Sequence, residues 1–366
     1  MSGYNNSKTG FTAQNKLWSV AVSKDDKMIA IGDYTSDGKV RVFSINEEIN
    51  NNNNNNSNKL NFILEKEEKL YSDTVRCLVF SDDDKNLLSC SDDKTIVLCD
   101  AKTLKKIKTF NGHTVSVFSA LFKSENEIVS CSIDRKIIVW DINSGIQIAS
   151  VDTRNSCFSL ALSPNKDMIL VGQGDGNIIV FGATIVNNTL TKITYLPKSH
   201  SNWIFFLCFS PNGKMLVSFS HDKTINVYEV ISNKSFKHIR TLTGHTGDIY
   251  GGAISPDGEL IASSSYDNTI KLWDINTGVC VKTITSHNGG VTNVAFSHSG
   301  SFLASVGYDK TFQITMNEDA LKFRNEKIHV ILSLAKSSIF IPFDIRQDYL
   351  EFVNSIRLNL IAKIIK

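Results

Sequence analysis

The chain has 366 residues, of which 42% are hydrophobic and 21% are charged, a composition typical of a globular protein. Its 39 Lys and Arg residues nearly balance 37 Asp and Glu residues, giving a formal net charge of +2. This balance argues against a domain that is held on nucleic acid by its overall charge, so direct contact with nucleic acid is not expected.

The seven cysteines include no CxxC pair, and most lie in apolar strand-like runs such as VRCLVF around Cys77 and VSCSI around Cys131. Buried free thiols behave as small hydrophobic groups, so we expect reduced cysteines and no disulfide framework.

Residues 1–10 are polar, lack the apolar core of a signal peptide and are expected to be flexible. No run is long and apolar enough to cross a bilayer. The expected location is the cytoplasm, the nucleus or both, without membrane association.

Further along the chain, a unit of three short strands repeats. Its clearest copy starts at Gly244 and reads GHTGDIYGGAISPDGELIASSSYDNTIKLWDINTG, with a Gly-His pair, a Ser-Pro-Asp-Gly turn and a final Trp-Asp. The best marker of the unit is an aspartate six residues before the end of the third strand. Seven copies contain it, as the pairs Asp37 and Phe43, Asp93 and Cys99, Asp134 and Trp140, Asp175 and Phe181, Asp222 and Tyr228, Asp267 and Trp273, and Asp309 and Thr315.

Successive marker aspartates are 56, 41, 41, 47, 45 and 42 residues apart, the first spacing being lengthened by an asparagine run. A period of roughly 40–45 residues with short strands is typical of WD40 repeats. Residues 11–316 therefore resemble the WD40 repeat family. The resemblance implies an all-β fold, a seven-bladed WD40-type β-propeller, in which radial packing buries both faces of sheets that could not bury them alone.

The resemblance also implies a hydrogen-bonded structural tetrad of His, Ser or Thr, Asp and Trp in each blade. Two blades contain the full set, namely His113, Ser130, Asp134 and Trp140, and His245, Ser263, Asp267 and Trp273. Two others keep the first three members but end in Tyr228 or Thr315, and the first, second and fourth blades lack the Gly-His opening. These departures leave individual blade edges open without changing the expected fold.

The parts outside the repeats leave alternatives open. Either a segment around Phe11–Gln14 or Ala320–Arg324 could supply the strand that closes the ring. The asparagine-rich segment 50–58 cannot bury apolar surface and is expected to be a disordered loop. Residues 317–366 form a C-terminal extension, in which apolar residues from Ile345 to Ile364 recur at helical spacing. This extension is expected to be an amphipathic helix that packs on the propeller or binds a partner, or an incomplete extra blade.

No catalytic constellation emerges from the sequence. Four histidines occupy the tetrad position, and the other four (His221, His238, His298 and His329) have no Cys/His/Asp neighbours at metal-ligand spacing. The sequence GQGDGN from Gly172 lies between two strands without a following helix, unlike a phosphate-binding loop. SDDDK from Ser81 stands where other repeats have SPDG and is expected to be an exposed turn. We expect no enzyme activity, cofactor, metal or small-molecule substrate.

Two sequence columns predict a partner-binding rim. The first, near the start of each first strand, reads Trp18, Arg76, Phe118, Phe158, Phe205, Tyr250 and Thr292. The second, just before each marker aspartate, reads Ser36, Asp92, Ile133, Gly174, His221, Tyr266 and Tyr308. Aromatic residues and Arg are enriched in interface hot spots, although large rings also fill gaps between strands. We expect the aromatic members and His221 to bind a partner, with Arg76 as a polar anchor.

The leading functional hypothesis is a non-catalytic scaffold that docks partner proteins or peptides on this rim, as a subunit of a larger complex. A substrate-recognition subunit of a ubiquitin ligase is an alternative, but Asn143 and Asn276 stand where such receptors often have a basic residue. A subunit of a chromatin or RNA-processing complex is another alternative. A propeller enzyme is the least supported, because the rim columns contain aromatic residues instead of clustered acids.

Overall fold

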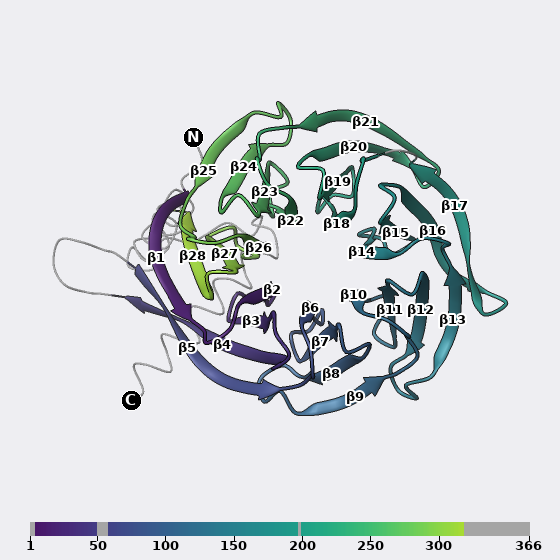
Figure 1. Ribbon diagram of the computed structural model, residues 1–366, viewed down its shortest axis with the longest axis horizontal. Helices are drawn as coiled ribbons and strands as arrows, with labels where there is room; N and C mark the ends of the chain where they lie inside the picture. The colour runs from purple at the N-terminus through teal and green to yellow at the C-terminus, as the bar shows by residue number, and fades with distance from the viewer. Residues whose placement is uncertain (1–3, 50–57, 197–198, 318–366) are drawn as a thin grey trace, which may run out of the picture. The chain divides into compact units, whose positions relative to one another are not determined.

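The computed structural model describes residues 4–49, 58–196 and 199–317, all of which lie in the first of two compact units. The described chain contains seven four-stranded antiparallel sheets, arranged as blades around a central axis (Figure 1). This arrangement confirms the predicted all-β seven-bladed propeller. No helix of the described chain has the length and apolarity needed to cross a membrane. Residues 318–366 of the predicted C-terminal extension, including Ala320–Arg324, and residues 50–57 of the asparagine-rich loop lie outside the described residues.

The strands of each blade run outward from the axis in chain order. Blade 1 consists of β2 (Leu17–Val22), β3 (Met28–Asp33), β4 (Lys39–Ile49) and β5 (Asn58–Lys69). Blade 2 consists of β6 (Val75–Phe80), β7 (Asn86–Ser91), β8 (Ile96–Asp100) and β9 (Lys106–Phe110). Blade 3 consists of β10 (Val117–Phe122), β11 (Glu127–Ser132), β12 (Lys136–Asp141) and β13 (Gln147–Asp152).

The same order continues around the ring. Blade 4 consists of β14 (Cys157–Leu162), β15 (Met168–Gln173), β16 (Ile178–Val186) and β17 (Thr189–Leu196). Blade 5 consists of β18 (Ile204–Phe209), β19 (Met215–Ser220), β20 (Ile225–Ser232) and β21 (Ser235–Leu242). Blade 6 consists of β22 (Ile249–Ile254), β23 (Leu260–Ser265), β24 (Ile270–Asp274) and β25 (Cys280–Ile284).

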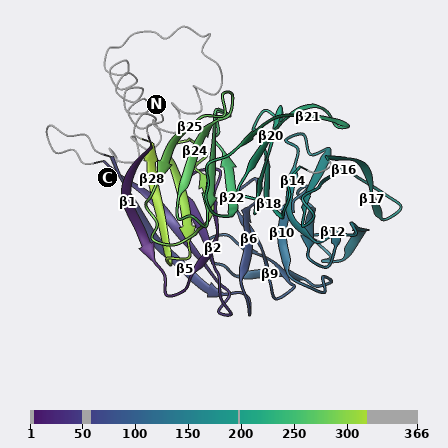
Figure 2. The same cartoon turned by 45° about the horizontal axis from the view of Figure 1, so that its top comes forward.

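Blade 7 combines both ends of the repeat region. It contains β26 (Val291–Phe296), β27 (Phe302–Gly307), β28 (Thr311–Asn317) and, on the outside, β1 (Tyr4–Thr12). Of the two closures expected, the N-terminal one is therefore present (Figure 2), but the closing strand starts earlier than Phe11–Gln14 and ends at Thr12. The structure also corrects the expectation of a flexible segment for Tyr4–Gly10, which belongs to β1. Polar side chains do not prevent this pairing, because the backbone groups of β1 satisfy the open edge of β28.

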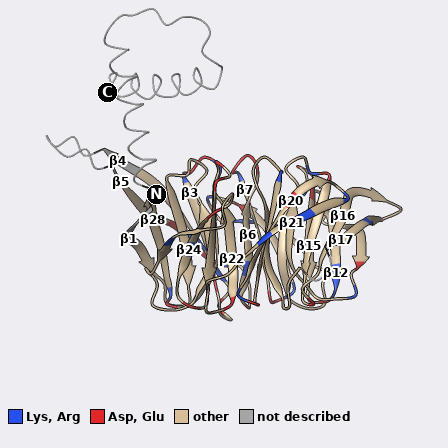
Figure 3. Ribbon diagram, turned by 90° about the horizontal axis from the view of Figure 1, so that it is seen from above, with Lys and Arg blue, Asp and Glu red and all other residues tan. Residues whose placement is uncertain are grey.

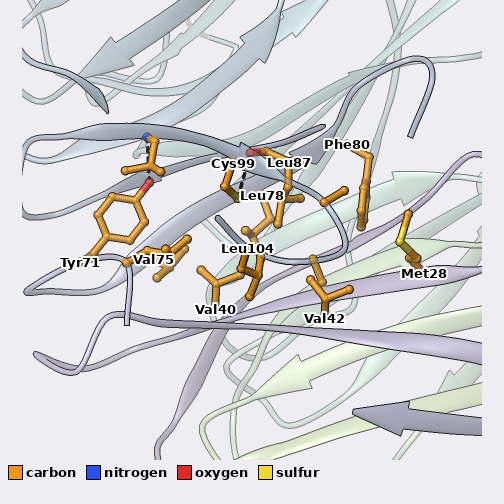
Figure 4. Close-up of a cluster of buried hydrophobic side chains, with 14 residues drawn as sticks. Met28, Val40, Val42, Tyr71, Val75, Leu78, Phe80, Leu87, Cys99 and Leu104 are labelled. Carbon is orange, nitrogen blue, oxygen red and sulfur yellow. Dashed lines mark hydrogen bonds between the residues drawn. The ribbon is translucent and has the colours of Figure 1, made fainter. Parts of the chain in front are cut away.

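Seven separate hydrophobic cores hold the ring together, one between each pair of neighbouring blades. Figure 4 shows the core between blades 1 and 2, in which Val40 and Val42 of β4 face Val75 and Leu78 of β6. Each central strand is thus buried on both faces, which explains its nearly continuous apolar sequence. The seven cysteines are all free thiols, most of them in these cores.

In blades 3, 5, 6 and 7, a buried histidine hydrogen-bonded to Asp and Ser ties the loop before the first strand to the turn after the second strand. In blade 3, His113 Nδ1 lies 2.8 Å from Asp134 Oδ2, and His113 Nε2 lies 2.8 Å from Ser130 Oγ, which also accepts from Trp140 Nε1 at 2.9 Å. In blade 6 the equivalent three contacts join His245, Ser263, Asp267 and Trp273 at 2.8, 2.8 and 2.9 Å. We call the face of the ring with these loops the tetrad face.

Blades without the Gly-His opening use other groups at the same place. In blade 2, Tyr71 occupies the histidine position: its hydroxyl contacts Ser89 Oγ at 2.7 Å and accepts the Val97 amide at 3.0 Å (Figure 4). In blade 1, a buried ion pair between Arg41 and Asp33 lies in the corresponding space. The network is therefore maintained by different chemistry where the sequence pattern fails.

Turns on the opposite face join neighbouring blades in two alternative ways. Where a turn contains proline, a glycine of the next blade lies against it, as Gly213 does against Pro164. In two turns without proline, an aspartate of the next blade binds the backbone amides instead: Asp84 accepts from the amides of Lys24 and Asp25 at 2.8 and 2.9 Å. Asp26 binds the amides of His298 and Ser299 in the same way, across the seam between blades 7 and 1. The acidic SDDDK turn is thus an interblade contact.

Replacing the tetrad hub Ser263 by Ala should destabilise the protein by about 3 kcal/mol, because His245 Nε2 and Trp273 Nε1 both lose their buried partner. Ser264→Ala is the matched control: Ser264 is also fully buried, but its hydroxyl makes no hydrogen bond. Urea unfolding should give a change below about 1 kcal/mol for the control. Equal losses in the two variants would show that the tetrad contributes no specific stability.

Stability should also fall in acid through the tetrad aspartates. Burial opposes ionisation of Asp134 and Asp309, but hydrogen bonds from their histidines and from backbone amides lower both pKa values from 3.8 to about 2. Because the folded-state pKa is below the unfolded value, this stabilisation is present above about pH 5 and is lost as the pH falls toward 2. Each aspartate should account for about 2 kcal/mol.

Urea unfolding between pH 7 and pH 3 measures this effect. The wild-type free energy of unfolding should decrease below about pH 5, and Asp309→Asn should be less stable at pH 7 and less sensitive to acid. A wild-type curve that is flat down to pH 3 would contradict the assignment.

Candidate functional site

The first sequence column forms the centre of the tetrad face. Its residues lie on the inner strands of different blades, yet their rings meet across the axis. The Trp18 ring centroid of blade 1 lies 5.4 Å from that of Tyr250 in blade 6 and 6.5 Å from that of Phe205 in blade 5. Phe158 completes the cluster, 5.6 Å from Phe205 and 4.9 Å from Phe118 of blade 3. The rings therefore cover the channel mouth instead of each facing solvent.

Thr292, the seventh member of this column, has a different role. Its side chain is buried, and its hydroxyl lies 3.0 Å from the Leu17 carbonyl oxygen and 3.1 Å from that of Val306. The residue thus links blade 7 to blade 1 at the closing seam and presents nothing to a partner.

Arg76 is integrated into the cluster and is not a free anchor. Its guanidinium carbon lies 4.4 Å from the Trp18 ring centroid and 4.6 Å from that of Phe118, within the range of cation–π contacts. The same group donates to both carboxylate oxygens of Asp92, at 2.9 and 2.6 Å. A bidentate pair of this kind satisfies the charge. Arg76 therefore stiffens the cluster, and the expected contact with an acidic partner group would require breaking the ion pair with Asp92.

The second column needs one correction, in blade 1. In six blades the column residue donates its amide to the carbonyl two residues before the first-column position, as Asp92 does to Thr74 and Tyr308 to Gly290. In blade 1 this bond is made by Tyr34, to Lys16, and not by Ser36. The turn of blade 1 is two residues longer, so counting back from Asp37 selected the wrong residue.

Tyr34 and Tyr308 extend the cluster around Trp18. The Tyr34 ring stacks on Trp18 with centroids 5.3 Å apart and lies 5.2 Å from Tyr308. The Lys16 ammonium lies 5.1 Å from the Tyr308 ring centroid. Burial raises the pKa of Tyr308 and of Tyr250, so both phenols stay neutral at physiological pH and act as amphipathic rings.

The exposed part of the site lies on blades 5 and 6. Trp203, which the sequence columns missed, is 43% exposed and stacks on Phe158 at 5.0 Å with an interplanar angle of 13°. Gly174 makes this stacking possible, because a Cβ there would lie 2.9 Å from Phe158 and 3.4 Å from Trp203. Tyr266 is 56% exposed and packs edge-on against Tyr250 at 6.3 Å.

His221 contacts Trp203 and pairs with Asp248, whose carbonyl oxygen accepts the Tyr266 amide. Its ring is 5.4 Å from that of Trp203, and its Nε2 lies 2.8 Å from Asp248 Oδ2. The imidazole and the carboxylate are both partly exposed. Trp203, His221 and Tyr266 therefore form an amphipathic surface, with apolar rings and polar tips, supported from below by the aromatic cluster.

A cavity of about 730 Å³ extends below the cluster along the axis and is lined by the inner strands of all seven blades. At its opposite end, Asp82 binds Lys24 of blade 1 at 2.7 Å and Lys166 of blade 4 at 2.8 Å. The hydrogen bonds from Lys166 and Lys24 lower the pKa of Asp82 to about 2. The channel thus has aromatic groups at one end and an ion network at the other.

The arrangement contains no evident reacting group. The four tetrad histidines are buried and bound to Asp and Ser or Thr partners. Across residues 4–49, 58–196 and 199–317, no three His, Cys, Asp or Glu residues are grouped closely enough to hold a metal ion. What the site offers chemically is a preorganised aromatic surface with partly exposed polar groups, which is suited to binding.

Comparison with known proteins agrees with this architecture. The family profile described as WD domain, G-beta repeat matches residues 6–44, 66–100, 104–141, 191–229, 236–274 and 278–314. The unmatched stretch between the third and fourth matches contains β14, β15 and β16. These strands belong to blade 4, which the structure shows to be a four-stranded blade like the others.

Several characterised relatives share parts of the chain. A ribosome biogenesis protein WDR12 homolog of Trichoplax adhaerens is 30% identical over 34% of this chain and 29% of its own length. The transcription factor unc-37 of Caenorhabditis elegans is 26% identical over 43% of this chain and 26% of its own. The ribosome biogenesis protein YTM1 of Scheffersomyces stipitis is 28% identical over 46% of this chain and 37% of its own.

In each of these comparisons the chain spans less than two fifths of the relative's length. The likeness therefore concerns the propeller. Together, the matched repeats and the seven blades show that the chain belongs to the WD40 repeat family.

Proposed function

We propose that the protein is a non-catalytic scaffold that docks a partner protein on the tetrad face, with Trp203 and Tyr266 as the main contacts. The observation that carries this proposal is the exposure of these two large rings, 43% and 56%, on top of a packed aromatic cluster. Aromatic residues in such positions are the typical hot spots of protein interfaces. Trp203 is held by Phe158 and Tyr266 by Tyr250, so little side-chain entropy is lost on binding.

The chemistry of this surface fits a protein segment with at least one apolar anchor. The rings of Trp203 and Tyr266 provide apolar area, while the His221–Asp248 pair provides a polar rim with hydrogen-bonding capacity. Trp18, Phe118, Phe158, Phe205, Tyr250, Tyr308 and Arg76 support the surface from within the cluster. Their proposed contribution to binding is to hold the exposed rings rigidly. A partner can also contact the ring edges of these residues.

The relatives support a setting in a nuclear multiprotein complex. Their names place two of them in ribosome biogenesis and one in transcription. We carry this to the present chain as a proposal: a scaffold subunit of an RNA-processing or chromatin-associated complex, located in the nucleus. No reaction is assigned to the protein.

The double variant Trp203→Ala, Tyr266→Ala should lose its partner while remaining folded. Loss of two hot-spot rings should weaken binding at least about 30-fold, enough to remove the partner from affinity-purified complexes. Quantitative mass spectrometry of complexes isolated with each variant measures this loss, followed by titration of the purified partner.

Ile146→Ala is the matched control, because Ile146 is also a large exposed apolar residue, 64% exposed, but lies in blade 3 before β13, away from the cluster. This control should retain every partner, and circular dichroism should show the same fold for all forms. Full retention of partners by the double variant would rule out the tetrad face as the docking surface.

A further inference from the structure

The outermost strands of blades 4 and 5 are basic, in contrast to the neutral chain as a whole. β17 (Thr189–Leu196) and β21 (Ser235–Leu242) together contain three Lys or Arg residues and no acidic residue. Lys234, in the turn directly before β21, adds a fourth positive charge. Lys192 belongs to β17, and Lys237 and Arg240 belong to β21. Figure 3 colours the Lys and Arg positions of the ring blue. A basic outer wall of this kind attracts polyanions, whatever the net charge of the protein.

A cleft opens in this wall between the outermost strands of the two blades. Its volume is about 470 Å³, and its lining includes Tyr195 on β17 and Lys234, Ser235 and His238 around the start of β21. The cleft coincides with a departure from the repeat. In blades 3 and 6, the tetrad Trp ring reaches the glycine before the histidine, as Trp140 reaches Gly112. Blade 5 has the smaller Tyr228 facing this region, which leaves space.

The floor of the cleft contains polar groups that a purely structural space would not need. Tyr228 is only 4% exposed, and its hydroxyl, although near Ser199, Ser218 and Asn226, makes no hydrogen bond of standard geometry. An unsatisfied buried hydroxyl is costly. Beside it, His238 Nε2 lies 3.1 Å from Asn226 Oδ1, to which it donates, and 3.1 Å from Thr241 Oγ1. These contacts fix the imidazole in the cleft wall.

An exposed aromatic ring stands at the edge of the cleft. Tyr195 is 49% exposed, and the Lys192 ammonium lies 4.3 Å from its ring centroid and 3.2 Å from its hydroxyl oxygen. The lysine therefore orients the ring while keeping a positive charge beside it. An open ring flanked by cations and by hydroxyl and imidazole groups is the combination that binds single-stranded nucleic acid, in which one base stacks and the adjacent phosphates are neutralised.

We propose that this cleft binds single-stranded nucleic acid, with one base stacked on Tyr195 and the backbone phosphates held by Lys192 and Lys234. The Tyr228 hydroxyl, Ser235 and His238 supply hydrogen-bonding groups to the nucleotide that enters the cleft. This site lies on the outer wall and is separate from the aromatic cluster on the tetrad face. It therefore adds a second binding activity to the proposed protein scaffold.

Fluorescence anisotropy with the full chain and a fluorescein-labelled 12-nucleotide oligouridine RNA, or the matching oligothymidine DNA, tests the proposal. Tyr195→Ala should weaken binding about tenfold or more, the loss expected for one base-stacking contact. Lys234→Glu should weaken binding and reduce its dependence on salt. Lys105→Glu is the matched control, because Lys105 is an exposed lysine between β8 and β9 in blade 2, and it should bind within about twofold of wild type.

The possible outcomes are distinct. Binding of RNA or of DNA that is lost in Tyr195→Ala and kept in Lys105→Glu supports the site, and the tighter of the two probes identifies the nucleic acid. No binding to either probe, or equal weakening by Tyr195→Ala and Lys105→Glu, overturns the proposal. Binding of a phosphoserine peptide in the cleft that neither oligonucleotide displaces also overturns it. The Trp203→Ala, Tyr266→Ala variant should keep full nucleic-acid binding, so failure of one site is distinguishable from failure of the other.

Discussion

The pairing of β1 with β28 is the constraint on which the rest of the structure depends. A propeller blade has two apolar faces and is stable only between two neighbours, so a ring with a gap would expose both a core and a strand edge. Here the last blade has three strands of its own, and the chain's first strand supplies the fourth. Phe11 of β1 and Phe43 of β4 pack at 5.2 Å, so closure also joins the last blade to the first. Closure brings Trp18 within contact of Tyr308, and thus makes one surface from residues 290 positions apart.

Two kinds of contact reinforce this closed ring, one at each face. On the tetrad face, histidine, tyrosine or a buried arginine pair holds the loop and the turn of a blade together. On the other face, a proline–glycine contact or an aspartate that binds two amides joins consecutive blades. Which of these two contacts forms depends on the turn between the first and second strands. Proline has no amide hydrogen to donate, so the aspartate contact occurs only at turns that lack proline. Asp26 performs this role at the closing seam.

The repeat made most of the fold predictable, because the marker aspartate recurs in all seven blades. Contacts between distant segments were not predictable in the same way. The bidentate partner of Arg76 is Asp92, in the turn after the neighbouring strand β7, and its cation–π partner Trp18 belongs to another blade. Tyr34 was missed because its turn is two residues longer than the others, and the hydrogen-bond register is what identifies it. Trp203 could have been found: it is the only aromatic residue in a column that is otherwise polar or small.

The rim contains two kinds of aromatic residue, buried and exposed. A column of rings predicts that the rings converge, but only packing shows which remain accessible. Trp18 and Phe158 are buried, whereas Trp203 and Tyr266 are exposed above them. The hypothesis of a binding rim therefore becomes a narrower proposal. The buried rings at the centre support the surface, and the exposed rings on blades 5 and 6 contact the partner.

Native-state hydrogen exchange of the peptide that contains Tyr4–Thr12 tests the closure of the ring most directly. If β1 completes the last blade, its amides bonded to β28 should exchange as slowly as those of β28 itself, because both require opening of the same sheet. Deuterium uptake measured by mass spectrometry over time should then rise together in the two strands. Rapid exchange throughout Tyr4–Thr12, with β28 still protected, would contradict the account and show that another segment covers the edge of the last blade.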